Sequence, residues 1–536
     1  MTTPVDGGME ARWQRARHCL DVRDLPAATA EFEAIVALDP HQPLAWLTLA
    51  RLAATQQRCR AAIEHARHAA AAVRASGQWQ LLADVALLLE GLGESLLAVQ
   101  LIQAADPLHP QVLAAADRLA QCLGQANVHD DALRLLDAAL ARSGPTLTLC
   151  YMRATTLRHL GRKAEATAEY QRCLQLAPDY AMAMLMLAQH DRSADSQAQL
   201  ARIRQALQRT SPRDPLNAAA LYYALFILLD AAGDTRGAWE AMARGAAIKR
   251  DNLQWHPARE DERVTAIRAL CQGAFLDPVA DTGDASQVPI FIVGQPRTGT
   301  TVLERILGNH SQVASAGELN DFHLQLCWEA DMLVEHVDPV LLRAGGALDF
   351  GAIGRGYRQR TAWRARDRRF LIDKLPVNFW YAGLIHKAMP DARIVCLVRD
   401  PLDTCFSNLK ELFAGNAYPY SYDPLEAAAQ HLRFRQMLQY WDEVLPGVVL
   451  TVRYEDLVRD PEPVARRVME HCGLPFEPGC VDLLRNQAPS ATASSSQVRE
   501  PIHARAIGAW RRYAQPLEEA RGWLAARLPP DAFVAD

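Results

Sequence analysis

The sequence contains very little lysine. Of its 57 basic residues only five are lysines, at positions 163, 249, 374, 387 and 410, and all the others are arginines. A lysine inside a motif is therefore an unusual choice for this chain. The formal net charge is −5, which argues against a general nucleic-acid binder and against charge-driven binding to anionic membranes.

Several targeting and metal signals are also missing. The first ten residues lack the basic stretch and apolar core of a signal peptide, and the longest apolar run, residues 218–229, is too short to span a bilayer. The eleven cysteines form no Cys-x-x-Cys pair, and their odd number fits reduced thiols. No His-Glu-x-x-His motif or Cys/His cluster occurs. We therefore expect a cytoplasmic protein with no membrane span and no catalytic metal.

The first half of the chain carries a repeat of about 34 residues. Alanines recur at positions 28, 62, 98, 132 and 166, and three of these copies close on a proline twelve residues later. In a helical hairpin a small alanine lets two helices approach, and a proline ends the second helix because it lacks an N–H. The pattern resembles tetratricopeptide (TPR) repeats. The resemblance implies an all-α solenoid that binds a peptide, a polymeric substrate, a partner or a second copy in a homodimer.

We expect this solenoid to cover residues 1–273, with Ala238 marking a degenerate further repeat. Residues 274–287 are rich in aspartate, glycine and small side chains, and we predict a linker there. Beyond it, strands are predicted at 289–293, 370–373, 393–398 and 448–452, with helices beginning after residues 299, 378, 401 and 461. Such alternation is typical of an α/β domain with an open parallel sheet, which we place at residues 288–536.

A glycine-rich loop follows the first predicted strand. Its spacing Gly294-x4-Gly299 matches the phosphate-binding P-loop, but Thr300 occupies the position where nucleotide hydrolases carry lysine. The cation lies inside the loop instead, at Arg297. Backbone N–H groups at the start of the next helix attract phosphate through the helix dipole. We therefore expect this loop to hold a phosphate without hydrolysing ATP.

The Pro-Arg-Thr-Gly-Thr-Thr sequence of this loop resembles the loop that grips the 5′-phosphate of 3′-phosphoadenosine 5′-phosphosulfate (PAPS) in sulfotransferases. A second motif contains Arg399 at the end of a predicted strand and Ser407 eight residues later. These two match the family's arginine and serine for the 3′-phosphate, and a guanidinium suits a bidentate phosphate contact. The residues that the resemblance assigns to PAPS in these two motifs are Arg297, Thr298, Gly299, Thr300, Thr301, Arg399 and Ser407.

Two further segments extend the resemblance. Tyr454, in a Tyr-Glu-Asp-Leu sequence, matches a tyrosine near the nucleotide, and Ser494 lies in a segment similar to the one that closes over the cofactor. The resemblance covers roughly residues 288–515 and is greatest to the tyrosylprotein branch of the family.

Three residues are candidates for catalysis. Lys374 follows a predicted strand and resembles the family lysine that contacts the transferring sulfonate. Glu318 is the first candidate for the general base and His310 the second. The tyrosylprotein branch has a second glutamate where this chain has Leu319, and an arginine where it has Asp321, so neither the base nor a tyrosine acceptor follows from the motif.

The sequence therefore predicts a TPR-containing, PAPS-dependent sulfotransferase that acts on a hydroxyl of a peptide tyrosine, a saccharide or a small molecule. The alternative is a non-catalytic TPR interaction protein whose P-loop-like domain senses a nucleotide.

Overall fold

The computed structural model describes residues 6–190, 196–211, 213–279, 286–490 and 499–534. The chain divides into two compact units. The first contains Met1–Met152 and Asn320–Trp363, and the second contains Arg153–Leu319 and Arg364–Asp536. Both units are therefore assembled from two separate stretches of sequence.

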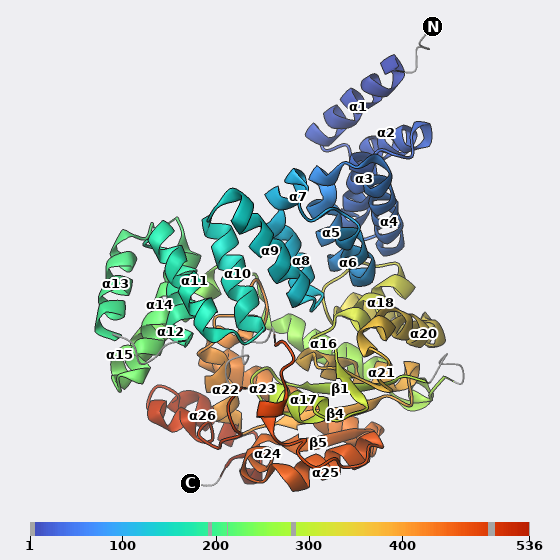
Figure 1. Cartoon of the computed structure of the whole chain (residues 1–536). Helices are drawn as coiled ribbons and strands as arrows, with labels where there is room; N and C mark the ends of the chain where they lie inside the picture. The colour runs from blue at the N-terminus through green and yellow to red at the C-terminus, as the bar shows by residue number, and fades with distance from the viewer. Residues whose placement is uncertain (1–5, 191–195, 212, 280–285, 491–498, 535–536) are drawn as a thin grey trace. The chain divides into compact units, whose positions relative to one another are not determined.

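The first unit is all-helical (Figure 1). Its helices are α1 (Asp6–Asp21), α2 (Leu25–Leu38), α3 (Pro43–Thr55), α4 (Cys59–Ser76), α5 (Leu82–Gly91), α6 (Ser95–Gln103), α7 (Pro110–Ala114), α8 (Ala116–Gln125), α9 (His129–Ser143), α18 (Asp321–Ala330), α19 (Pro339–Ala344) and α20 (Phe350–Thr361). Helix α10 (Leu147–His159) contains the boundary between the two units.

The repeat pattern is confirmed in the packing of these helices. The alanines at positions 28, 62, 98 and 132 lie on α2, α4, α6 and α9, the second helices of successive hairpins, and all four are fully buried. Ala166 is equally buried on α11 of the second unit. The period of the sequence therefore marks buried positions on the second helix of each hairpin.

Helices α18 to α20 follow β2 in the chain, yet they pack within the first unit. The Arg360 guanidinium lies 3.3 Å from the Glu94 carboxylate and donates hydrogen bonds to the Leu92 and Gly93 carbonyls at the turn before α6. Arg60 on α4 donates to the Trp328 carbonyl at the end of α18. This insertion is therefore bound to the hairpins α3–α4 and α5–α6.

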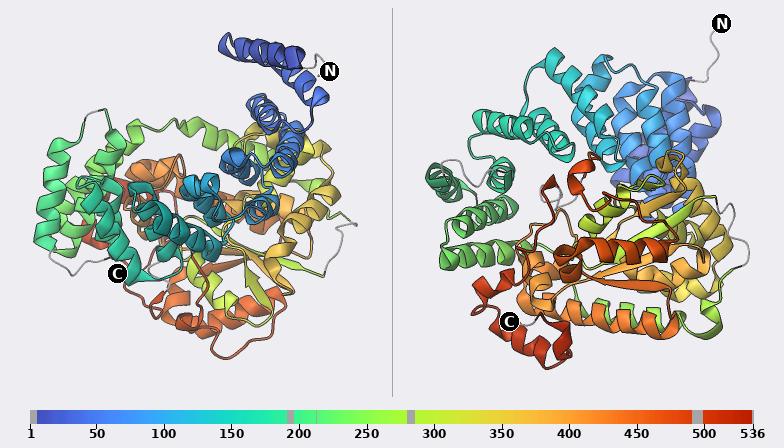
Figure 2. Two further views of the ribbon diagram at one scale, coloured as in Figure 1. Left: turned by 45° about the horizontal axis from the view of Figure 1, so that its top comes forward. Right: turned by 60° about the horizontal axis from the view of Figure 1, so that its bottom comes forward.

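The second unit combines helical hairpins with a parallel sheet (Figure 2). Its strands are β1 (Val288–Gly294), β2 (Val313–Ser315), β3 (Phe370–Asp373), β4 (Arg393–Val398) and β5 (Val449–Arg453). Its helices are α11 (Lys163–Leu176), α12 (Ala181–His190), α13 (Ser196–Arg209), α14 (Pro215–Ala231), α15 (Thr235–Asp251), α16 (Pro257–Leu270), α17 (Thr300–Gly308), α21 (Ala382–Ala388), α22 (Pro401–Leu409), α23 (Pro424–Val444), α24 (Tyr454–Arg459), α25 (Pro461–Cys472) and α26 (Glu518–Ala525).

The strands of the described residues pair in the order β2-β3-β1-β4-β5, and every pairing is parallel. Strand β1 is buried along its whole length, which explains its continuous apolar sequence. Ile290 and Ile292 on one face pack with apolar residues of α17 and α25. On α23 the Trp441 indole donates to the Phe379 carbonyl. Because the strands are parallel, the carboxyl ends of β1 and its neighbours, and the loops that follow them, lie at one edge of the sheet.

The sequence-predicted fold class, a TPR-type helical array followed by a P-loop-like parallel-sheet domain, is confirmed. The predicted strands at 370–373 and 393–398 coincide with β3 and β4, while β1 and β5 differ by a residue at their ends. The compact units are not the predicted domains, whose boundaries at residues 273 and 288 stay predictions.

Candidate active site

The loop between β1 and α17 has the backbone of a phosphate cradle. Gly294 ends β1 with φ of 147°, and a Cβ there would lie 2.6 Å from the Leu397 carbonyl oxygen on β4. Gly299 caps α17 with φ of 97°. Thr298 is fully buried, and its hydroxyl donates to the Gln295 carbonyl over 2.8 Å. Glycine at both ends and the buried threonine therefore shape this turn.

Helix α17 begins directly after the loop with Thr300 and Thr301, both buried. Its N-cap, Gly299, provides no side-chain acceptor for the first N–H groups, and helix starts of this kind bind anions. Arg297, with φ of 69°, lies in the same turn, and its Nη1 is 3.9 Å from Glu411 Oε2. The loop thus combines backbone donors with one largely buried guanidinium.

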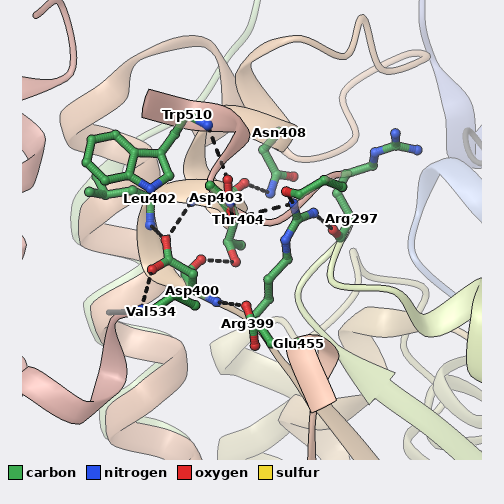
Figure 3. A network of polar contacts seen from close by, with 12 residues as sticks. Arg297, Arg399, Asp400, Leu402, Asp403, Thr404, Asn408, Glu455, Trp510 and Val534 are labelled. Atoms are coloured by element: carbon green, nitrogen blue, oxygen red, sulfur yellow. Dashed lines mark hydrogen bonds and ion pairs between the residues drawn. The ribbon is translucent and has the colours of Figure 1, made fainter. Parts of the chain in front are cut away.

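Arg399 joins this loop to the adjacent strand (Figure 3). It follows β4, and its guanidinium donates to the Arg297 carbonyl over 3.1 Å and to the Ala506 carbonyl over 2.5 Å. Its Nε is buried, and among the described residues it has no hydrogen-bond partner. The two arginines that the sequence assigned to separate phosphates therefore lie in one cluster.

Tyr454 lies between the two phosphate motifs. The Arg399 guanidinium carbon is 4.6 Å from the centroid of its ring, a cation–π distance. A Cβ on Gly299 would lie 2.4 Å from Tyr454 Cδ2. Because the ring packs directly on the loop, glycine is required there, and Tyr454 contacts both motifs.

Helix α22 fixes the remaining part of this edge (Figure 3). Asp400 caps it and accepts hydrogen bonds from the N–H groups of Leu402 and Asp403. The Asn408 side chain donates to the Pro296 carbonyl over 3.1 Å and so ties the helix to the phosphate loop. Ser407 is buried on the same helix, in the part of the site where the sequence predicts the 3′-phosphate.

Lys374 and Glu318 form an ion pair at the carboxyl end of β3. Lys374 Nζ is 2.5 Å from Glu318 Oε1 and 3.9 Å from Glu304 Oε2. The lysine side chain is 1% exposed, whereas that of Glu318 is 40% exposed. Burial lowers the pKa of Lys374, but the carboxylates of Glu318 and Glu304 outweigh this and raise it above its usual value. The lysine is therefore held charged beside a carboxylate that solvent can reach.

The other two candidates lie elsewhere. His310 is buried after α17, its Nε2 lies 2.9 Å from the Pro475 carbonyl, and its Nδ1 accepts the Gln312 N–H. Both ring nitrogens are thus engaged, and its role as a base stays a prediction. Ser494 lies outside the described residues.

The structure adds residues that the motifs did not reveal. Glu304, on α17, accepts a hydrogen bond from the Ser315 hydroxyl over 2.5 Å and provides a second carboxylate for Lys374. His431 on α23 lies 2.6 Å from Gln295 Oε1, and burial lowers its pKa to about 3. The neutral imidazole therefore supports the phosphate loop from behind.

Lys410 is another cation that the motifs did not assign. It follows α22, immediately before Glu411. Burial, and then Arg297 and Arg399, lower its pKa to about 8. Three cations therefore act on one another at this edge of the sheet.

The described residues contain neither a metal-binding cluster nor a membrane-spanning helix. Within the described ranges, no three or more His, Cys, Asp or Glu side chains are arranged to hold a metal ion. No helix in the part of the chain that the structure describes is long and apolar enough to cross a bilayer.

Part of the chain matches a known protein family. Residues 289–478, which hold both phosphate motifs and the Lys374 region, match the model of the sulfotransferase family. This part of the chain is similar to sulfotransferases, and we call it the sulfotransferase segment. The charged groups of the candidate site, from Arg297 to His431, lie within these residues.

The curated relatives that the chain matches are distant. An uncharacterized protein of Aquifex aeolicus (strain VF5) is 28% identical over 308 residues, which are 56% of this chain and 40% of that protein. A Caenorhabditis briggsae protein named "Putative protein-tyrosine sulfotransferase" is 23% identical over 226 residues, 41% of this chain and 80% of that protein. The nodulation protein NoeE of Sinorhizobium fredii (strain NBRC 101917 / NGR234) is 31% identical over 133 residues, 22% of this chain and 30% of that protein.

Proposed function

We propose that this chain transfers a sulfonate group from PAPS to a hydroxyl acceptor. The observation that carries the proposal is the hydrogen bond from Arg399 to the Arg297 carbonyl, because it brings both phosphate motifs into one cluster. The charged pair of Lys374 and Glu318 belongs to the same edge of the sheet. Anion-binding cations and a solvent-accessible carboxylate are the groups that sulfonate transfer requires.

The residues fit PAPS as a co-substrate. The N–H groups at the start of α17 and the Arg297 guanidinium provide donors for a 5′-phosphate. The buried Nε of Arg399, which has no hydrogen-bond partner among the described residues, provides one for a 3′-phosphate. Ser407 and Tyr454 complete the proposed nucleotide contacts. Ser494 is retained in the proposal from the sequence alone. Each charge-assisted hydrogen bond contributes on the order of 1.5–3 kcal/mol.

Catalysis follows from positioning and fixed charge, as in phosphoryl transfer. Glu318 takes the proton of the acceptor hydroxyl. The acceptor oxygen then forms a bond to sulfur, the bond from sulfur to the phosphate oxygen breaks, and its electron pair leaves with the phosphate. Lys374 and Arg297 neutralise the charge that develops on the bridging oxygen and the departing phosphate.

The ion pair of Lys374 and Glu318 must open for Glu318 to act as the base. While Glu318 binds the ammonium, its carboxylate is engaged with Lys374 Nζ and not with an acceptor hydroxyl. A sulfonate near Lys374 competes for the ammonium and releases Glu318 toward the acceptor. Glu304 remains beside the lysine and keeps it charged throughout.

The acceptor class and the role of the repeats belong to the proposal as well. A peptide tyrosine, a saccharide and a small-molecule alcohol all offer the hydroxyl that Glu318 would deprotonate. TPR-type hairpins commonly bind protein segments, so we propose that the array binds the acceptor or a partner protein, with a homodimer as a further arrangement. A cytoplasmic location stays a prediction.

The test compares nucleotides and then measures transfer. The full chain is titrated with 3′-phosphoadenosine 5′-phosphate (PAP) and with ATP and Mg²⁺ in a calorimeter, and radiolabelled PAPS is then incubated with phenols, tyrosine peptides and saccharides. We expect PAP to bind much more tightly than ATP, and label to appear on one acceptor class.

Two other outcomes would overturn the proposal. Tight PAP binding without transfer to any acceptor, including those in a cell extract, would favour the non-catalytic nucleotide sensor. Strong ATP binding with hydrolysis would identify a nucleotide hydrolase instead.

A further inference from the structure

Helices α14 and α15 pack against loops of the sulfotransferase segment as well as against each other. The sequence pattern groups this pair with the repeats, because Ala238 continues the alanine series, and Ala238 is fully buried on α15. Both helices belong to the second compact unit together with the sheet. Their polar contacts with that unit include two segments that reach the arginines of the candidate site.

The first segment is the loop after α22. Tyr223 on α14 is buried, and its hydroxyl donates to the Leu409 carbonyl at the end of α22 over 2.9 Å. Lys249 on α15 donates to the Gly415 carbonyl over 2.8 Å. Glu411, whose carboxylate faces Arg297, lies between these two anchored residues. Thus α14 and α15 fix both ends of the loop that contacts the phosphate-loop arginine.

The second segment lies near the carboxyl terminus. Asp230, in the last turn of α14, accepts a hydrogen bond from the Tyr513 hydroxyl over 2.5 Å and pairs with Arg512 at 2.9 Å. The same segment places the Ala506 carbonyl on Arg399. Asp230 therefore holds the segment that contacts the second arginine.

The Asp403 carboxylate is the other end of this attachment. It accepts hydrogen bonds from the N–H groups of Gly508 and Trp510 over 2.7 Å and 3.2 Å. Residues 506–513 are thus fixed to α22 on one side and to α14 on the other. Because α22 begins directly after Arg399, a shift of this segment moves the surroundings of that guanidinium.

We propose that α14 and α15 form a positioning element of the nucleotide site, in which Tyr223 holds the loop 409–415 at Arg297 and Asp230 holds the segment 506–513 at Arg399. The inference rests on the proposed function, because it takes these two arginines as the PAPS ligands. Neither Tyr223 nor Asp230 touches the nucleotide. Helices that the sequence groups with the repeats are consequently required for nucleotide binding.

The positioning role of Asp230 is tested on the full chain by calorimetry. The ligands are PAP and adenosine 5′-phosphate, which lacks the 3′-phosphate. We expect Asp230→Asn to weaken PAP binding about tenfold, the scale of one lost charge-assisted bond, and to leave adenosine 5′-phosphate binding nearly unchanged. Asp251→Asn, an exposed position on α15, is the matched control and binds both nucleotides like wild type.

A double-mutant cycle separates positioning from general destabilisation. At a pH well below the pKa of Lys410, where that lysine stays charged, Asp230→Asn should cause no further loss of PAP affinity in an Arg399→Ala background, because its effect acts through Arg399. If Asp230→Asn lowered the affinity for both nucleotides equally, and the loss persisted in this background, the positioning role of Asp230 would be wrong. If Asp230→Asn does not fold, Tyr513→Phe removes the same hydrogen bond from the other side.

The positioning role of Tyr223 is tested in the same way. Tyr223→Phe keeps the ring and removes only the hydroxyl, and we expect PAP binding to weaken about twofold to tenfold, with no added effect in a Glu411→Gln background. Tyr222→Phe is the control, since the neighbouring ring contacts Arg244 instead of the loop. Unchanged PAP affinity in Tyr223→Phe would show that the loop needs no such anchor.

Different results would contradict the proposed function and the positioning role. If the wild-type chain neither binds PAP nor transfers sulfonate, the proposed function is wrong and the positioning role falls with it. If wild type binds PAP and the Asp230 and Tyr223 variants bind it equally well, only the positioning role is wrong.

Discussion

Lys374 and Glu318 are joined by a 2.5 Å contact in which the lysine is buried and the glutamate reaches solvent. The pair connects β3 with the loop after β2, two neighbouring strands of the sheet. A buried ammonium needs a carboxylate partner, and here two are present. Glu318 is the exposed partner, so it is in a position to react.

Replacing Glu318 with glutamine should lower turnover about a hundredfold, the usual scale for losing a general base, while PAP affinity stays nearly unchanged. Glutamine keeps the size of the side chain and a hydrogen-bonding oxygen for Lys374. Steady-state transfer rates and calorimetry measure the two effects. If Glu318→Gln turned over normally and His310→Ala were inactive, the base would be His310.

Arg399→Ala should weaken PAP binding roughly tenfold to a hundredfold, since it removes a charge-assisted contact. The loss should be specific to the 3′-phosphate, so the affinity for adenosine 5′-phosphate is the internal control. Arg399→Lys should recover only part of the affinity, because lysine cannot make the planar bidentate contact. Equal PAP affinity in wild type and a folded Arg399→Ala variant would contradict the assignment.

Gly299→Ala should destabilise the protein by about 2 kcal/mol or more, because a residue with a Cβ is strained at positive φ. The added Cβ would also lie 2.4 Å from Tyr454 Cδ2, so PAP binding should fall. Thermal unfolding and calorimetry report the two effects. Gly522→Ala on α26 is the control: nothing lies within 4 Å of its Cβ position, and alanine in a helix should stabilise by roughly 0.5–1 kcal/mol.

PAP affinity should depend on the charge of Lys410. Burial, Arg297 and Arg399 lower its pKa to about 8, against the opposing effects of Asp230 and Glu411. The ammonium is therefore present below that pH and is lost as the pH rises through it, so binding of the anionic ligand should weaken between about pH 7 and pH 9.

Arginine substitution isolates this titration. Lys410→Arg stays charged over the whole range and should show a flat affinity, whereas Lys387→Arg, whose lysine contacts the Asp277 carbonyl, should follow wild type. A wild-type affinity that is independent of pH in this window would contradict the prediction.

The sequence predicted those parts of the fold that local patterns determine. Continuous apolar runs located β1, β3 and β4 because strands buried on both faces have no polar positions. Gly294 and Gly299 located the phosphate loop, since the turn requires a backbone that other residues avoid. The edge strand β2 escaped prediction because three residues give no recognisable pattern.

The parts of the site that escaped prediction depend on contacts between distant segments. Glu304 looks like an ordinary polar position of a helix, and only the approach of β3 gives it a lysine to neutralise. Glu411 and His431 lie in no motif, and their relation to the phosphate loop appears once α22 and α23 pack beside β1. Lys374 and Glu318 were separate candidates for catalysis, and the structure brings them together, while their catalytic roles stay predictions.

The insertion α18–α20 has a consequence for how the chain can be divided. The ribosome makes β1 and β2, then a segment that packs with α4 and α6, and only afterwards β3, which pairs with both strands already made. A single cut before β1 would therefore leave α18–α20 without the hairpins that cover them. A minimal transferase would need two deletions. The first removes residues 1–152, and the second replaces residues 320–363 with a short linker, while α14 and α15 are retained.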